Sequence, residues 1–402
     1  MVNSIQILNC PDEAIICAQL ATIGVEATGI KIMSPKMVHW LIKIKKLTAT
    51  QANIIKQQLL SGGGEAATAY GVINHSVDFS DVIIAATAAQ LKIALEKLKM
   101  QAFGLKELAE ALEEAVANFT KVPTLEVGGR RLDLAQKPLI MGILNVTPDS
   151  FYDGGRYPTP EIALKKAEEM LTAGADIIDV GGESSRPGSK PVSEKDEQDR
   201  VIPIIEKISQ KFKPPISIDT TKAAVAKAAL EAGAAIINDI SALRFDSRMA
   251  ELASRSGAGL ILMHLQGTPE NMQTDPHYED IICEISDFFK ERIAFAVQAG
   301  IKKEQIILDP GIGFGKTVEH NLEIIRHLSS FKILGRPILV GLSRKSFIGK
   351  ILGLEPKERL EGSLAAATAA ALNGAQILRV HDVGETIRAV KIIRALQMGK
   401  IS

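Results

Sequence analysis

The sequence has no excess of charge of either sign. Its 402 residues include 47 Lys and Arg against 47 Asp and Glu, so the formal net charge is zero. Proteins that bind nucleic acid commonly carry a basic excess, and we expect no nucleic-acid partner here. Any site for an anion must therefore be built locally, from a few side chains.

Cysteines are few and long apolar runs are missing. Cys10, Cys17 and Cys283 form no CxxC pair and no metal-ligand spacing, which fits thiols in a reducing cytosol. The uncharged stretch 362–378 contains polar residues and is shorter than the ~20 residues that cross a bilayer. The N-terminus has no basic region followed by an apolar core, so we expect no signal peptide, no membrane partner and a cytoplasmic location.

The length predicts two or three domains at about 150 residues each. Residues 1–122 predict a small α/β or α+β domain, with strands at 5–9, 37–44 and 82–85 and helices at 48–60 and 103–119. Thr48 is positioned to cap the first of these helices. No constellation in this domain points to chemistry, and its role is left open. Residues 125–133, with a Gly-Gly turn, predict a hairpin at the start of a second domain, 123–402.

From residue 138 onward, apolar β-rich runs alternate with helical stretches, which predicts parallel βα units. The runs are 139–144, 176–180, 216–218, 236–240, 260–263, 306–308, 338–341 and 377–380. Eight such units in this length predict a (β/α)8 TIM barrel. A doubly wound open sheet is the main alternative, although it usually has fewer strands.

Each predicted strand ends in a side chain that can form hydrogen bonds. The set is Asn145, Asp179, Asp219, Asn238, His264, Asp309, Ser343 and His381. One such residue would be a structural group, but eight at equivalent positions indicate a site, because barrel enzymes place their chemistry at the C-terminal ends of the strands.

The residue types at these ends indicate two kinds of ligand. Asp219, Asn238 and Asp309, with Lys345, suit a flat heterocycle that presents N–H donors and ring acceptors. Arg379 and the helix start near Ser346 follow the last two strands, where barrels commonly bind phosphate. Barrel-mouth ion pairing, for example Lys345 with Asp309, is the alternative without a ligand.

Three predicted loops have an unusual residue composition. Residues 147–155 and 181–188 are rich in Gly, Pro and charge, and Phe151 and Arg186 within them suggest loops that order around a substrate. Residues 310–317 (PGIGFGKT) nearly match a Walker A sequence, but Pro310 replaces its first glycine and no partner motif is evident. We therefore expect no ATP site.

Together these segments resemble the dihydropteroate synthase family. The similarity rests on residues 141–151 (MGILNVTPDSF), 179–188 (DVGGESSRPG), 309–316 (DPGIGFGK), 343–346 (SRKS) and 379–381 (RVH), and it extends from about residue 138 to the C-terminus. Ser185 stands where many members have threonine, and Tyr152 replaces a common serine. The N-terminal domain is outside the core family pattern.

The resemblance implies a role for each matching residue. It implies a pterin site from Asp219, Asn238, Asp309 and Lys345, with Met263 and Phe314 packing nearby. It implies a pyrophosphate site from Asn145, Ser185, Arg379 and His381, and a p-aminobenzoate site from Phe151, Ser185, Arg186, Pro187 and Ser346. It implies Mg²⁺ near Asn145 and Asp153, with Asn145, Lys345, Arg379 and His381 taking part in catalysis.

The implied reaction condenses p-aminobenzoate with 6-hydroxymethyl-7,8-dihydropterin pyrophosphate to 7,8-dihydropteroate and pyrophosphate. It belongs to folate biosynthesis and is blocked by sulfonamides, and family members are typically homodimers. Two alternatives stay open at this point. A pterin-dependent methyltransferase has a similar barrel and pterin pocket, but does not need Arg379, His381 or the Phe151 and Arg186 loops. A catalytically silent pterin-binding module is the other.

Overall fold

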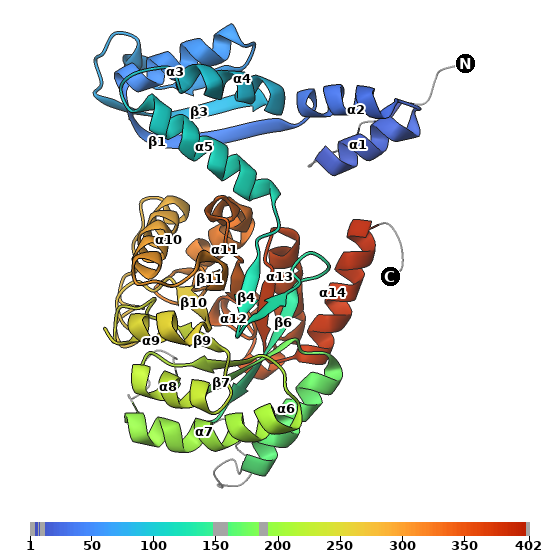
Figure 1. Ribbon diagram of the computed structural model, residues 1–402, viewed down its shortest axis with the longest axis vertical. Helices are drawn as coiled ribbons and strands as arrows, with labels where there is room; N and C mark the ends of the chain where they lie inside the picture. Colours follow the sequence, from blue (N-terminus) through green and yellow to red (C-terminus); the bar gives the residue numbers. More distant parts are fainter. Residues whose placement is uncertain (1–4, 7, 9–12, 148–159, 185–191, 399–402) are drawn as a thin grey trace. The chain divides into compact units, whose positions relative to one another are not determined.

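The chain divides into two compact units, Met1–Val116 and Ala117–Ser402. The structure is a computed structural model that describes residues 5, 6, 8, 13–147, 160–184 and 192–398 (Figure 1). The division falls earlier than residue 122, inside helix α5 (Leu105–Thr120), because the end of this helix packs with the second unit. There Asn118 Nδ2 donates to the Ile333 carbonyl at 3.0 Å, and Lys332 Nζ lies 4.6 Å from the centre of the Phe119 ring.

The N-terminal unit is a three-stranded antiparallel sheet with helices. Its strands β1 (His39–Thr48), β2 (Glu65–Thr68) and β3 (Phe79–Thr87) lie in the order β1-β3-β2. Helices α3 (Ala49–Ser61), α4 (Ala88–Leu98) and the first part of α5 share its core, and α1 (Glu13–Thr22) and α2 (Ala27–Met33) precede the sheet. Residues 5, 6 and 8 are not in a strand, so the strand predicted at 5–9 is wrong where it is described.

Strands β1 and β3 each lead into a helix through the same local motif. Thr48 and Thr87 accept from the backbone N–H of Gln51 and Gln90, at 3.3 and 3.2 Å, and each Gln side chain accepts from its threonine N–H in return. These reciprocal bonds satisfy backbone donors that a helix start leaves without partners. The Thr-x-x-Gln spacing therefore explains why both helices begin directly at a strand end, as predicted at Thr48.

The second unit contains an eight-stranded parallel barrel. Its strands are β6 (Leu139–Asn145), β7 (Ile177–Gly181), β8 (Ile216–Asp219), β9 (Ile236–Asp239), β10 (Gly259–Met263), β11 (Ile306–Asp309), β12 (Leu339–Gly341) and β13 (Ile377–Val380). They lie in the order β11-β10-β9-β8-β7-β6-β13-β12, and a parallel bridge between Leu308 and Ile338 joins the two ends. The predicted TIM barrel is confirmed, with its eight strands within one or two residues of their predicted limits.

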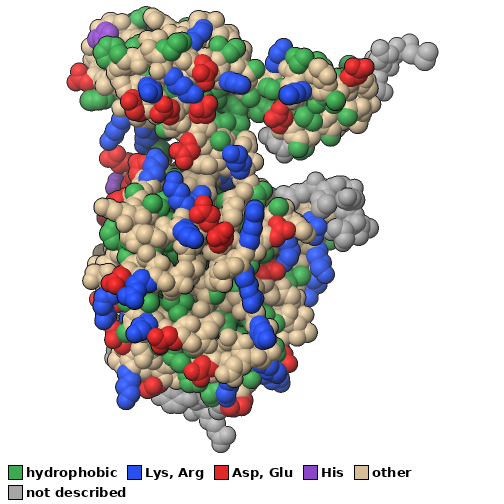
Figure 2. Space-filling model, viewed as in Figure 1, with side chains coloured by type: hydrophobic (Ala, Val, Ile, Leu, Met, Phe, Trp, Pro, Cys, Tyr) green, Lys and Arg blue, Asp and Glu red, His purple; other side chains and the backbone are tan. Residues whose placement is uncertain are grey.

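Helices surround the barrel strands (Figure 1). They are α6 (Pro160–Ala173), α7 (Glu194–Lys211), α8 (Ala223–Glu231), α9 (Met249–Ser256), α10 (Ile281–Gln298), α11 (Val318–Arg326), α12 (Ser346–Leu352), α13 (Leu360–Leu372) and α14 (Val383–Met398). In the part of the chain that is described, no helix is both long and apolar enough to cross a membrane. The face drawn in Figure 2 carries acidic and basic side chains interspersed, as the balanced composition leads one to expect.

A hairpin of β4 (Leu125–Val127) and β5 (Arg130–Leu132) closes the N-terminal end of the barrel. Leu125 and Val127 are buried in one cluster with residues from the first halves of the strands, among them Leu139, Ile177 and Ile377. This cluster, which we call the apolar plug, fills the barrel interior at the N-terminal ends of the strands. The opposite end of the barrel is therefore the one where polar side chains can collect.

We predict that a chain that begins at Ala117 folds alone, because it keeps the hairpin and the Asn118 contact. A chain that begins at Leu139 should melt at a clearly lower temperature, since Leu125 and Val127 each bury a side chain worth ~1.5–3 kcal/mol. Thermal unfolding followed by circular dichroism compares the two chains with the full protein. A chain from Ala117 that shows no cooperative transition would mean that the N-terminal unit is needed for folding.

Candidate active site

The polar ends of the strands face the same interior as the apolar plug, because side chains on a strand alternate with a period of two. Four isoleucines of the plug, Ile177, Ile236, Ile307 and Ile377, each lie two positions before a polar residue. Those polar residues are Asp179, Asn238, Asp309 and Arg379. The same interior side of the strands therefore carries an apolar layer at the N-terminal end of the barrel and a polar layer at the C-terminal end.

Arg379 lies at the centre of this polar layer, between two carboxylates. Its Nε donates to Asp179 Oδ2 and its Nη2 to Asp219 Oδ2, both at 2.6 Å. The Asp179 side chain is fully buried, and those of Asp219 and Arg379 are 13% and 19% exposed. Burial raises the pKa of Asp219 to about 7; the Arg379 charge opposes this shift, and Asp179 and Glu197 add to it.

Asp179 was one of the eight strand-end residues, but the sequence assigned it no role. In the structure it orients Arg379 and also lies 3.4 Å from Asn238 Nδ2. Its second oxygen, Oδ1, is buried and has no hydrogen-bond partner among the described residues. Buried polar atoms nearly always have partners, so this oxygen is an acceptor that a bound molecule could satisfy.

The glycine-rich loop after β11 forms one wall of the site. Asp309 Oδ1 accepts from the Gly311 N–H at 2.8 Å, and burial raises the pKa of Asp309. Lys345 Nζ donates to the Ile312 carbonyl at 2.5 Å and lies 4.1 Å from the centre of the Phe314 ring. The described ion pairs do not include Lys345 with Asp309. Burial lowers the pKa of Lys345 to about 8, although the nearby Asp309 opposes this shift.

The lysine of the Walker-like sequence, Lys316, is buried and does not extend from the loop. Only 3% of it is exposed, and its Nζ donates to the Phe314 carbonyl at 2.9 Å and lies 3.0 Å from His264 Nδ1. Burial lowers the pKa of Lys316 to about 7, and burial together with the Lys316 charge lowers the pKa of His264. Lys316 therefore fixes the loop that carries Phe314, a role that the sequence analysis did not find.

The ends of β6, β12 and β13 border a cavity of about 240 Å³, whose walls include Asn145, Lys166, His381 and Asp382. His381 Nδ1 lies 3.1 Å from Ser343 Oγ, which also accepts from the His381 N–H at 3.3 Å. Asn145 and His381, two of the four residues expected at pyrophosphate, thus line one cavity. Basic side chains and amide groups of this kind suit a phosphoryl ligand.

The structure gives a position to most of the predicted site residues. Met263 is buried with Phe314 packed against its cluster, and Ser346 is exposed at the first position of α12. Phe151, Asp153, Ser185, Arg186 and Pro187 lie outside the described residues. The pterin residues and Arg379 are therefore brought together, and the proposed p-aminobenzoate residues, apart from Ser346, are not described.

Comparison with known proteins agrees with this arrangement. A family model described as "Pterin binding enzyme" matches residues 141–381. The dihydropteroate synthase of Escherichia coli (strain K12) is 49% identical over 272 residues, which is 68% of this chain and 96% of that protein. A crystal structure of the Yersinia pestis dihydropteroate synthase in complex with a sulfonamide drug is similar with a TM-score of 0.66 at 48% identity, over 68% of this chain and 99% of that one.

A further relative extends the similarity beyond the barrel. The probable bifunctional folylpolyglutamate synthase/dihydropteroate synthase of Halobacterium salinarum is 40% identical over 371 residues, which is 92% of this chain and 44% of that protein. The unit Ala117–Ser402 is too short to supply so many aligned residues. The match therefore includes much of the N-terminal unit as well.

We predict that Lys316→Met changes the pH dependence of stability. The folded-state pKa of about 7 lies below the ordinary value of 10.5, so between these values the unfolded chain holds a proton that the folded chain has lost. The penalty for burying Lys316 is thus complete below pH 7 and shrinks as the pH rises toward 10.5. The advantage in melting temperature of the variant over the parent should be largest at pH 6 and clearly smaller at pH 9. An equal difference at both pH values would contradict the burial of a charged Lys316.

Proposed function

The chain belongs to the dihydropteroate synthases of the pterin-binding enzyme family, and on that premise we propose how its residues carry out the reaction. The substrates would be 6-hydroxymethyl-7,8-dihydropterin pyrophosphate and p-aminobenzoate, and the products 7,8-dihydropteroate and pyrophosphate. The observation that supports this most directly is the largely buried polar layer of Asp219, Asn238, Asp309, Lys345 and Arg379. It offers carboxylates to ring N–H groups and cations to an anionic leaving group.

The pterin ring would bind with its N–H edge toward the carboxylates. Asp309 Oδ1 accepts from Gly311, so Oδ2 is the oxygen that we expect to face the ring; burial raises the pKa of Asp309 although this bond and the nearby cations oppose the shift. Met263 and Phe314 would pack on the ring faces. Buried acceptors of this kind select against rings without matching donors, since an unpaired acceptor is costly.

The pyrophosphate would bind at the ends of β6 and β13. Arg379 uses Nε and Nη2 for its two carboxylates, so Nη1 is the nitrogen we expect to face the phosphoryl oxygens, with Asn145 and His381 at the same end. Charge that develops on the leaving group is stabilised best by donors that are already oriented. Asp179 and Asp219 supply that orientation for Arg379.

Asn145 is the one expected Mg²⁺ ligand that lies within the described residues, and its chemistry would suit the ion. Mg²⁺ prefers oxygen ligands and is commonly held by one or two protein oxygens together with substrate phosphates. Asn145 supplies an amide oxygen close to Gly181, and the described residues include no group of three or more His, Cys, Asp and Glu that would form a complete protein site. Asn145 and Asp153 would hold the ion, which would neutralise charge on the pyrophosphate when bound.

The reaction needs no nucleophile from the protein. The bond between the pterin methylene carbon and the pyrophosphate oxygen breaks, and its electron pair leaves on pyrophosphate. The electron-rich dihydropterin ring delocalises the resulting cation. The p-aminobenzoate nitrogen then bonds to the methylene carbon and loses a proton to solvent. The residues of the chain orient both substrates and exclude water, which would otherwise capture the cation.

We also propose that the protein acts as a cytoplasmic homodimer. Helix α13 contains the run LEGSLAAATAAAL, in which Ala365 is exposed and Leu372 is 53% exposed. Small side chains on a helix allow another helix to approach closely, and an exposed leucine beside them provides apolar contact area. This surface is the one we expect to be covered in a dimer.

The test of the proposed function is turnover, measured as pyrophosphate release from the dihydropterin pyrophosphate in the presence of p-aminobenzoate. We expect Asp309→Asn to weaken pterin binding by ~1–3 kcal/mol, because its amide accepts from Gly311 but presents a donor to a ring that also donates. Asp287→Asn is the matched control, since Asp287 is exposed on α10. Calorimetry that finds equal pterin affinity in the parent and Asp309→Asn would remove Asp309 from the pocket.

We predict an order of substrate binding. The expected p-aminobenzoate residues Phe151, Ser185, Arg186 and Pro187 fall in segments that the sequence predicts to be loops, whereas Asp219, Asn238 and Asp309 of the pterin site and Arg379 of the pyrophosphate site lie at or near strand ends. Pyrophosphate with Mg²⁺ should therefore increase the affinity for p-aminobenzoate, with a coupling of ~1–3 kcal/mol. Sulfonamides should show the same dependence. Titrations with and without Mg²⁺ and pyrophosphate measure it, and equal affinities would mean that the pocket is formed in advance.

A further inference from the structure

One peptide in the loop after β11, between Ile312 and Gly313, is bound by a side chain at each of its polar groups. Its carbonyl oxygen accepts from Lys345 Nζ at 2.5 Å, and its N–H donates to Asn321 Oδ1 at 2.7 Å. The C=O and N–H of a trans peptide point in opposite directions, and the described peptide bonds include none that is cis. Asn321 and Lys345 therefore lie on opposite sides of one peptide plane.

The peptide that follows is held from a third part of the barrel. The Gly313 carbonyl accepts from Gln273 Nε2 at 2.8 Å, and Gln273 lies in the connection between β10 and α10. Gly313 itself has a φ of +80°, and a Cβ there would be 3.0 Å from Lys345 Cδ. The backbone at Gly313 is thus packed on the stem of Lys345 and held by two amide side chains, those of Asn321 and Gln273.

Asn321 is suited to hold this backbone because both ends of its amide are used. It lies near the start of α11 and is only 2% exposed. While its Oδ1 accepts from Gly313, its Nδ2 donates to the Thr317 carbonyl at 2.6 Å. A donor and an acceptor on different partners fix which way the amide points. Asn321 thus ties the middle of the loop to Thr317, the residue that caps α11.

The residues of the loop do not fix its shape by themselves. Positions 311, 313 and 315 are all glycines, with φ of +67°, +80° and +61°. Glycine restricts the backbone less than any other residue does. The same loop carries Phe314, and it carries the Ile312 carbonyl that binds Lys345, whose Nζ is 4.1 Å from the centre of the Phe314 ring. The positions of Phe314 and Lys345 therefore depend on side chains from outside the loop.

We propose that Asn321 and Gln273 are positioning residues for the pterin substrate, acting through the backbone of Gly313. This inference rests on the proposed function, which assigns Lys345 and Phe314 to the pterin. The hydrogen bonds described for Asn321 and Gln273 go to main-chain groups, so both would act on the substrate only through the loop. Without them the Gly313 backbone would lose its partners, and the carbonyl that orients the Lys345 ammonium could turn away.

The experiment compares the KM values for both substrates in the 402-residue protein. We expect Asn321→Leu, which removes both bonds at nearly equal side-chain size, to raise the KM for the dihydropterin pyrophosphate about tenfold, as the loss of one charge-assisted hydrogen bond would. The KM for p-aminobenzoate should change by less than about twofold. Asn321→Asp keeps an oxygen that accepts from the Gly313 N–H, and it should restore most of the loss in the pterin KM.

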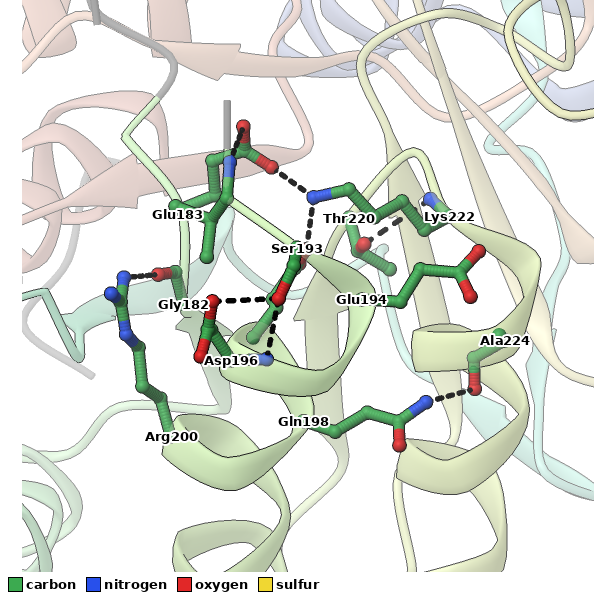
Figure 3. Close-up of polar contacts among 12 residues, drawn as sticks. Gly182, Glu183, Ser193, Glu194, Asp196, Gln198, Arg200, Thr220, Lys222 and Ala224 are labelled. Atoms are coloured by element: carbon green, nitrogen blue, oxygen red, sulfur yellow. Dashed lines mark hydrogen bonds and ion pairs between the residues drawn. The ribbon is translucent and has the colours of Figure 1, made fainter. Parts of the chain in front are cut away.

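Gln198→Leu is the matched control. Figure 3 shows the Gln198 side chain on α7, which donates to the Ala224 carbonyl on α8 at 3.1 Å. The variant therefore removes a bond from an amide side chain to a main-chain carbonyl in the same barrel, but leaves the contacts of Gly313 in place. Both KM values should stay within about twofold of the parent.

A second variant decides the question if Asn321→Leu does not fold. Gln273 is exposed, so Gln273→Leu should keep the melting temperature of the parent while it frees the Gly313 carbonyl, and we expect it to raise the pterin KM about threefold. An unchanged pterin KM in Gln273→Leu would overturn the proposal. So would a folded Asn321→Leu that leaves both KM values unchanged or raises them equally, or an Asn321→Asp with the same pterin KM as Asn321→Leu. An inactive parent protein would overturn the proposed function, and this inference with it.

Discussion

The guanidinium of Arg379 links three strands at the C-terminal end of the barrel through hydrogen bonds to two carboxylates. It extends from β13 to carboxylates on β7 and β8, on the far side of β6 in the strand order. Both acids are largely buried, so removal of Arg379 would leave them without their counter-ion in a medium that solvates charge poorly. The carboxylates are thereby fixed as acceptors and the arginine as a donor before any substrate arrives.

The sequence predicted the barrel and the polar layer because both depend on local patterns. Short apolar runs identify strands, and the period of two places the residue after each run in the interior. The Arg379 pairing could not be predicted, because it depends on which strands face each other across the interior. The role of Lys316 was not predicted for the same reason: the sequence only excluded an ATP site in its loop, and the burial of the amine against His264 depends on how the turn folds. No feature of the sequence indicated Asn321, since it binds the main-chain N–H of Gly313 and every residue except proline carries such a group.

The limits of the N-terminal unit show how a helix can obscure a boundary. Helical periodicity continues from Leu105 through Thr120, so the sequence offers no break between the units. Only the contacts of Asn118 and Phe119 assign the last turn to the barrel unit. The Halobacterium salinarum relative is similar in sequence over much of this N-terminal unit as well. The described residues of the N-terminal unit are organised around the two Thr-x-x-Gln helix starts, with an apolar core and no group of three or more metal-ligating side chains.

Gly311 limits which substitutions the site can tolerate. Its φ of +67° is one that side chains rarely adopt, and a Cβ there would lie 2.0 Å from the His264 carbonyl oxygen. No other amino acid fits without moving the β10 strand end, and Asp309 would then lose its Gly311 partner. A single substitution at Gly311 would therefore disrupt the wall beside the proposed pterin pocket. An inhibitor that relied on this wall would therefore leave few routes to resistance by substitution at Gly311.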